Sequence, residues 1–199
     1  MNNNKMIAMM LTMSMLAAAF AGCLGGDEED DTPDWSISMA SDVSADFVES
    51  AWDPIIPNLN AGDMCDAIIS AMTKTDEREQ AVDFTRAYYT SSQAVIGGSG
   101  AASISAVADL NADSTTIGVQ SGTTSDLYAQ ANLGAATISA YDDFPSVIAA
   151  LNNGDVHYAM GDAPVLALEG TLMVTFSDEN FGMAVQGDSS GELLGALNM

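Results

Sequence analysis

Two stretches of the chain repeat one order of residues, and this doubling restricts the fold more than any other feature. WDPIIPNLNAGDMCDAIIS (residues 52–70) begins with Trp-Asp, and YDDFPSVIAALNNGDVHYAMGD (141–162) begins with Tyr-Asp. Each continues with a proline early in a predicted helix, a Leu-Asn-x-Gly stop and an apolar stretch typical of a buried strand. Because ligands bind beyond the carboxyl ends of strands in open parallel sheets, the two copies predict two lobes facing each other across a cleft.

The rest of the sequence alternates predicted strands with predicted helices, which indicates an α/β fold with mainly parallel sheets. Strands are predicted at 34–42, 46–50, 65–72, 88–98, 114–120, 136–141, 155–162, 172–176 and 181–186. Helices or helical turns are predicted at 52–62, 75–82, 99–110, 121–133, 144–154, 164–170 and 190–199. In the second copy, Pro145 suits the first helical turn and Gly154 follows the end of the helix.

The charge of the chain limits what it can bind. The 199 residues include 28 acidic and 4 basic side chains, which gives a formal net charge of −24. Such a surface repels nucleic acid and anionic lipid. A bound anion therefore depends on backbone dipoles or on the few cations, which are Lys74, Arg78 and Arg86 once Lys5 is removed with a leader.

The first 22 residues have the pattern of a secretory signal peptide, with an apolar stretch at 6–21. They end in Phe-Ala-Gly before Cys23, which resembles the lipobox where a peptidase cuts and the new N-terminal cysteine is lipidated. An uncleaved membrane anchor is the alternative, although the apolar stretch is short for a span. Residues 23–34 are then an acidic lipoprotein tether, and the protein is expected outside the cytoplasm, anchored to the membrane.

Four further stretches, IISAMTKTDEREQAVDFTRAYYTS, IGVQSGTTSDLYA, YDDFPSVIAALNNGDVHYAMGD and FGMAVQGDSSGELLGALN, strongly resemble the extracellular solute-binding proteins of family 3. The resemblance implies a two-lobed, periplasmic-binding-protein-like (type II) fold. Lobe one would comprise 35–91 plus 181–199, and lobe two 92–180. It also implies a receptor that passes an amino acid to the permease of an ABC importer, with no catalytic residue, metal or cofactor.

The resemblance further implies which residues bind the ligand. Arg78 would hold the α-carboxylate, for which a guanidinium fork is well suited; Asp162 would accept the α-ammonium. The other implied contacts are Gly122, Thr123 and Thr124 at a helix start, and Ser70, Ala71, Met72 and Thr73 after the first-copy strand. The alternatives are a solvated arginine in a short helix for Arg78 and helix or turn capping for Ser70, Thr73, Thr123, Thr124 and Asp162.

Other notable residues are expected to be structural. His157 is interpreted as a packed core histidine and Cys65 as a small buried strand residue. Asp142 and Asp143 are expected in a solvated turn. The similarity implies a mostly structural role for Asp83, Phe84, Tyr88 and Tyr89.

The sequence departs from the family's pattern in lobe one. The loop and helix that usually follow the first strand are missing after Asp42, and the final helix is cut at Met199. Lobe one is therefore expected to be incomplete, without the wall that selects the ligand's side chain. Two alternative functions stay open: a dehydratase-like enzyme on the same scaffold, and a shortened, non-transporting paralogue or sensor partner.

Overall fold

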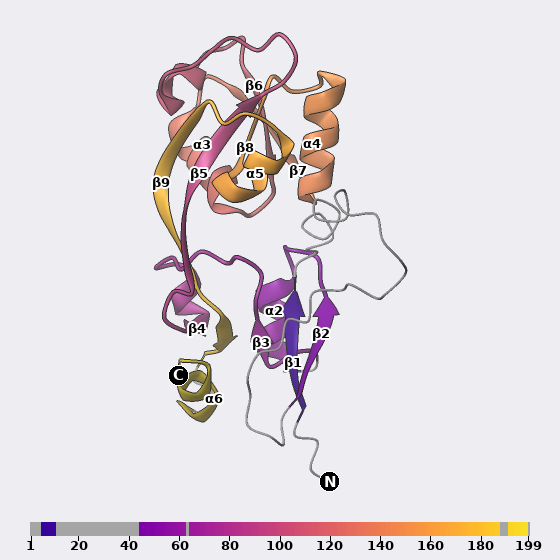
Figure 1. The fold of residues 1–199 in the computed structure, drawn as a ribbon, viewed down its shortest axis with the longest axis vertical. Coiled ribbons are helices and arrows are strands. Elements are labelled where there is room, and N and C mark those ends of the chain that lie inside the picture. The colour runs from indigo at the N-terminus through magenta and orange to yellow at the C-terminus, as the bar shows by residue number, and fades with distance from the viewer. Residues whose placement is uncertain (1–4, 11–43, 63, 188–190, 199) are drawn as a thin grey trace, which may run out of the picture.

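The computed structural model describes residues 5–10, 44–62, 64–187 and 191–198, which form two lobes, each built on a five-stranded sheet (Figure 1). The strand predicted at 34–42, the tether and the lipidation site Cys23 lie outside the described residues. Within the described residues, no helix is both long enough and apolar enough to cross a bilayer.

The sheet of lobe one has the strand order β2-β1-β3-β10-β4. Its strands are β1 (Lys5–Met10), β2 (Ser44–Glu49), β3 (Ala67–Ile68), β4 (Val82–Phe84) and β10 (Ala184–Gln186). Helix α2 (Ile55–Ala61) packs its buried Ile55 and Leu59 into a core with Trp52, Cys65, Ile68 and Met72. The short 3-10 helix η1 (Arg78–Gln80) and helix α6 (Gly191–Leu197) complete the described part of this lobe.

Strand β1 differs from the sequence-based expectation that residues 1–22 stay outside the fold. Residues Lys5–Met10 pair in parallel with both β2 and β3. A strand between two parallel neighbours needs a continuous apolar stretch, and Met6–Met10 offers the same composition that suggests a signal peptide. The assignment of 1–22 as a signal peptide stays a prediction.

The sheet of lobe two has the order β7-β6-β8-β5-β9, with helices on both faces. Alternate residues divide between two cores, since Ala94 and Ile96 face α4 and α5 while Val95 faces α3. The strands are β5 (Tyr89–Gly97), β6 (Thr116–Gln120), β7 (Thr137–Tyr141), β8 (Tyr158–Asp162) and β9 (Val174–Phe181). The helices are η2 (Val107–Leu110), α3 (Thr124–Asn132), α4 (Phe144–Asn153) and α5 (Ala163–Glu169).

Each sheet combines two parallel with two antiparallel pairings. In lobe two the parallel pairs join strands that were predicted to alternate with helices, whereas in lobe one both parallel pairs involve the unexpected strand β1. The antiparallel pairs involve β5, β9 and β10, and β5 and β9 run side by side from one lobe toward the other (Figure 1). The chain crosses between the lobes through these segments. The predicted alternation of strands with helices therefore did not indicate that they pair antiparallel.

The doubled stretch forms the predicted element twice. Helices α2 and α4 both end at a glycine in the left-handed conformation, Gly62 at φ 72° and Gly154 at φ 81°. Each helix is followed by a buried strand, β3 or β8. Asp143 is exposed, as expected, and it caps α4 by accepting a hydrogen bond from Ser146 N at 2.8 Å.

Cys65 and His157, which were both expected to be buried structural residues, differ in burial. Cys65 is buried as expected, just before β3, and burial with the charge of Asp66 raises the pKa of its thiol to about 11. The prediction for His157 is wrong, because its side chain is exposed. His157 precedes β8 and contacts Thr116 through Nδ1, so the apolar strand that suggested burial begins one residue later.

Candidate functional site

Arg78 lies at the start of η1 in lobe one, and its guanidinium reaches lobe two. Nη1 donates to Thr73 O at 2.8 Å, and Nη2 donates to Gly122 O at 3.4 Å. Cζ lies 5.1 Å from the centre of the Trp52 ring, within the range of a cation–π contact. The backbone N–H of Arg78 donates to Thr75 Oγ1 at 3.2 Å, so the Thr75 hydroxyl supports the turn that leads into η1.

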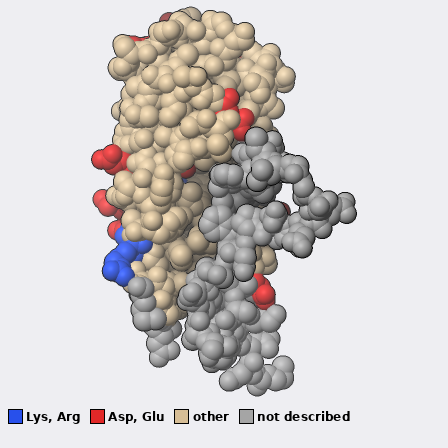
Figure 2. Space-filling model, viewed as in Figure 1, with Lys and Arg blue, Asp and Glu red and all other residues tan. Residues whose placement is uncertain are grey.

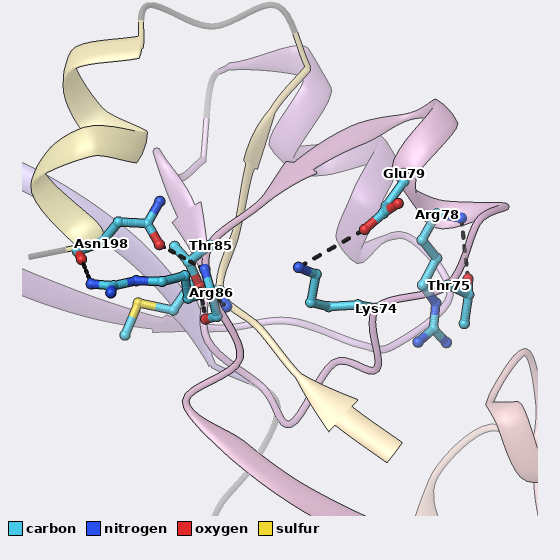
Figure 3. A network of polar contacts seen from close by, with 8 residues as sticks. Lys74, Thr75, Arg78, Glu79, Thr85, Arg86 and Asn198 are labelled. Atoms are coloured by element: carbon cyan, nitrogen blue, oxygen red, sulfur yellow. Dashed lines mark hydrogen bonds and ion pairs between the residues drawn. The ribbon is translucent and has the colours of Figure 1, made fainter. Parts of the chain in front are cut away.

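The other two cations expected in the mature chain are directed elsewhere. Figure 3 shows the Lys74 ammonium pointing to Glu79, at 3.9 Å, and the Arg78 guanidinium lying apart from both. Arg86 donates from Nη2 to Asn198 O, and its backbone N–H donates to Asn198 Oδ1 at 2.6 Å. On the face in Figure 2, acidic side chains are spread over both lobes, whereas basic ones gather at one edge. Arg78 is therefore the fixed cation best placed to bind an anion between the lobes.

A hollow of about 120 Å³ lies beside Arg78. Lobe two contributes Gly122, and lobe one contributes the other lining residues, Trp52, Asp53, Ile55, Ile56, Met72 and Arg78. Gly122 has φ +67°, and a Cβ placed there would lie 3.3 Å from Asp53 Oδ1. Glycine thus allows both the left-handed turn and the close approach of the two lobes.

The predicted contacts of lobe one lie between β3 and η1. Ser70 Oγ is buried and has no hydrogen-bond partner among the described residues. Ala71 adopts a left-handed φ of 51°, unusual for a residue with a Cβ, and its N–H donates to the Tyr88 hydroxyl at 3.0 Å. Met72 is fully buried in the lobe-one core, and Thr73 offers its carbonyl to Arg78.

Two of the predicted contacts of lobe two, Thr124 and Asp162, meet at Gln93. Its Nε2 donates to Asp162 Oδ1 at 2.6 Å and to Thr124 Oγ1 at 3.1 Å, while its Oε1 accepts from Ser125 Oγ. Asp162 occupies the N-cap position of α5 but makes no side-chain capping bond there. Thr123 does cap α3, since its hydroxyl accepts from Asp126 N and donates to Gln120 O. The capping alternative thus fits Thr123 better than Asp162.

Charges from both lobes meet at this place. Burial raises the pKa of Asp162 to about 6, opposed by the Gln93 hydrogen bond; the charge of Glu179 raises it further, and that of Arg78 lowers it. Burial also lowers the pKa of Arg78, and the charges of Glu179 and Asp162 oppose this effect. The structure therefore brings Arg78 of lobe one and Asp162 of lobe two into one electrostatic environment.

Sequence reasoning did not identify four residues that shape this site: Trp52, Gln93, Ser125 and Glu179. Trp52 was visible as the aromatic start of the first repeated stretch. Gln93 was the polar residue within the apolar strand 88–98, and a buried amide in a strand commonly serves a specific partner. Tyr88, expected to be structural, is half exposed and supplies its hydroxyl to Ala71 N.

Comparison with known proteins agrees with the geometry. The sequence model of the bacterial extracellular solute-binding proteins, family 3, matches residues 36–143. A probable histidine-binding protein of Neisseria gonorrhoeae is 30% identical over 163 residues, which are 76% of this chain and 60% of the relative. The L-arginine-binding protein of Pseudomonas aeruginosa is 40% identical over 96 residues, 48% of this chain and 36% of the relative. The chain thus spans about 60% or less of the length of these curated relatives.

Among solved structures, a similar one is an ancestral amino-acid-binding protein described as a precursor of cyclohexadienyl dehydratase. It aligns with a TM-score of 0.77 and 26% identity, covering 98% of this chain and 87% of that protein. The two-lobed type II fold is shared over nearly the whole chain. With the family match over more than half of its residues, the chain belongs to the bacterial extracellular solute-binding proteins, family 3.

Proposed function

We propose that this protein is the extracytoplasmic substrate-binding component of an ABC importer, and that it closes its lobes on a polar amino acid or similar small zwitterion. The observation that carries the proposal is the reach of Arg78 across the cleft to Gly122 O, with Asp162 in the same electrostatic environment. A cation and an acid on opposite lobes match the two charged ends of an α-amino acid. The names of the histidine- and arginine-binding relatives support this ligand class.

In the proposed complex, Arg78 pairs with the α-carboxylate and Asp162 accepts the α-ammonium. Thr124, the Gly122 backbone and Ser70 to Thr73 supply hydrogen bonds. The ligand favours the closed form because it contacts both lobes at once, whereas an open form contacts it with only one. The buried, unpartnered Ser70 hydroxyl is available to such a ligand.

A melting-temperature screen of the twenty amino acids tests this function. A ligand at one hundred times its Kd adds about 2.7 kcal/mol to the free energy of unfolding. We expect at least one amino acid to stabilise the protein and to lose that effect in Arg78→Ala. No stabilisation by any of the twenty would instead favour the non-transporting paralogue.

The proposal includes attachment to the membrane through a lipid on Cys23 after removal of residues 1–22, which also takes strand β1 out of the sheet of lobe one. Two acyl chains give stable anchoring where one is marginal. Replacement of Cys23 by Ala should release the protein from the membrane fraction of expressing cells and abolish incorporation of labelled fatty acid. Retention of the variant in that fraction would favour the uncleaved anchor.

A dehydratase-like activity is the second candidate, and the observation for it is the raised pKa of Asp162; the ancestral structure itself is described as an amino-acid-binding protein and a precursor of such an enzyme. An acid with a pKa of about 6 can give and take protons near neutral pH. Incubation with prephenate-like acids distinguishes the two, because an enzyme eliminates water and carbon dioxide from such a substrate to form an aromatic ring, and a receptor leaves it unchanged. Turnover that is lost in Asp162→Asn would establish the enzyme.

A further inference from the structure

Strand β9 contains an irregularity beside the site. In its pairing with β5, Ser92 lies opposite Asp178 and Gln93 opposite Phe176, so Ser177 is an extra residue on β9. Ser177 has a φ of +50°, a left-handed conformation that is unfavourable for a residue with a Cβ. Bulges of this kind are concentrated next to functional sites, where they redirect side chains.

The bulge places the carboxylate of Glu179 inside the protein. Glu179 is only 5% exposed, and its Oε1 accepts a hydrogen bond from Ser177 Oγ at 2.9 Å. Its Oε2 is buried and has no hydrogen-bond partner in the part of the chain that the structure describes. A buried carboxylate oxygen without a hydrogen-bond donor is unfavourable. A ligand group that donates a hydrogen bond to Oε2 would therefore be stabilised there.

Glu179 also lies where β9 meets residues 70–74 of lobe one, which include the proposed ligand contacts Ser70 to Thr73. The neighbouring Asn180 accepts a hydrogen bond through its carbonyl from Lys74 N at 2.9 Å, and Gly182 N donates to Met72 O at 3.1 Å. Phe181 forms a β-bridge with Thr73. Ser70 Oγ, at the start of the same segment, is the other unpartnered buried side-chain atom among the described residues.

The charges of the site are unequal. The charges of Glu179, Asp162 and Glu77 all act on the cation Arg78, whose guanidinium donates to the carbonyls of Thr73 and Gly122. A zwitterion pairs its carboxylate with Arg78 and its ammonium with Asp162, and it brings no further charge for Glu179. A second cationic group on the ligand would balance the site.

We propose that Glu179 is a specificity-determining residue whose Oε2 accepts a hydrogen bond from the cationic side chain of a bound amino acid, so that the site selects basic over neutral ligands. This inference rests on the proposed function. Ser177 is then a positioning residue that orients the carboxylate. Selection follows because a neutral ligand leaves a buried charge unpaired, which penalises the wrong partner.

Arginine and citrulline test the proposal, because they have similar shape and differ in side-chain charge. Titration calorimetry on the purified full chain should show arginine binding at least tenfold tighter than citrulline. Glu179→Gln should reduce that ratio at least fivefold by weakening arginine, with citrulline bound as well as before or better. Asp178→Asn, the same charge change at the exposed neighbour, should keep the wild-type ratio.

An unchanged ratio in Glu179→Gln, or equal affinities in the wild type, would overturn the inference. If Glu179→Gln does not fold, the comparison of arginine with citrulline in the wild type tests the inference by itself. Tight binding of a neutral amino acid in preference to arginine contradicts only the role of Glu179. Absence of binding by all twenty amino acids contradicts the proposed function as well, so the two failures are distinguishable.

Discussion

Replacement of Arg78 by Ala removes the group that, in the proposed function, binds the ligand carboxylate. The guanidinium is half-buried, stacks against Trp52 and forms a fork that already donates to two carbonyl oxygens. A charged hydrogen bond contributes about 1.5–3 kcal/mol, and the variant leaves the ligand carboxylate in a partly buried site without its partner. We expect a loss of about 2–4 kcal/mol of binding free energy, which is roughly 30- to 1,000-fold in Kd.

Titration calorimetry with the amino acid found in the melting screen measures this loss. Arg78→Lys keeps the charge without the fork and should lie between the wild type and Arg78→Ala. Arg86→Ala is the matched control, because Arg86 is held by Asn198 rather than directed into the cleft. Equal affinity in the wild type and in Arg78→Ala would refute the assignment of Arg78.

Three further predictions follow from individual contacts. The folded-state pKa of Asp162, about 6, lies above its ordinary 3.8, so its contribution to the stability of the ligand-free protein is full below pH 3.8 and is lost as the pH rises through 6. Because the ligand ammonium needs the ionised acid, affinity measured by calorimetry should weaken up to about tenfold per pH unit below 6, and Asp162→Asn should flatten this profile. Gly122→Ala should cost about 1–2 kcal/mol through its left-handed φ and should weaken binding by separating the lobes, whereas Gly134→Ala, at an open position without a positive φ, should leave binding unchanged. Gln93→Leu should lower the free energy of unfolding in urea by about 1–3 kcal/mol, because Asp162, Thr124 and Ser125 each lose a hydrogen bond to Gln93. A change below about 0.5 kcal/mol would show that these bonds contribute little.

Much of lobe two was predictable from the sequence, because its signals are local. Pro145 and Gly154 mark the ends of α4 as expected, and the apolar stretches 114–120 and 155–162 contain β6 and β8. The central strands are buried on both faces, and successive residues point alternately to one helix layer and to the other. Local patterns of this kind need no knowledge of distant partners.

Lobe one was less predictable, because its elements depend on distant partners. The strand expected over 65–72 is only Ala67–Ile68, since its neighbours in the sheet are β1 and β10, far away in the sequence. Residues Lys5–Met10 form a strand although their composition is typical of a leader. An apolar segment does not itself distinguish burial in a sheet from burial in a membrane.

The residues of the site divide in the same way, into those recognisable from the nearby sequence and those that depend on distant strand pairing. Arg78 stands out in the sequence as one of few cations, and the family resemblance indicated Gly122 and Asp162; the structure brings the three together. Gln93 and Glu179 depend on the pairing of β5 with β9 and on the bulge at Ser177. A bulge in that pairing is set by register, which the residues of one strand alone do not specify.

The proposed function requires that opposite lobes hold one ligand at its two ends. A calorimetric cycle tests this directly, with the bound amino acid and its methyl ester measured against the wild type and Arg78→Ala. If Arg78 binds the carboxylate, esterification should cost about 2–4 kcal/mol in the wild type and less than about 0.5 kcal/mol in the variant. An equal cost of esterification in both proteins would place the carboxylate away from Arg78 and contradict the account.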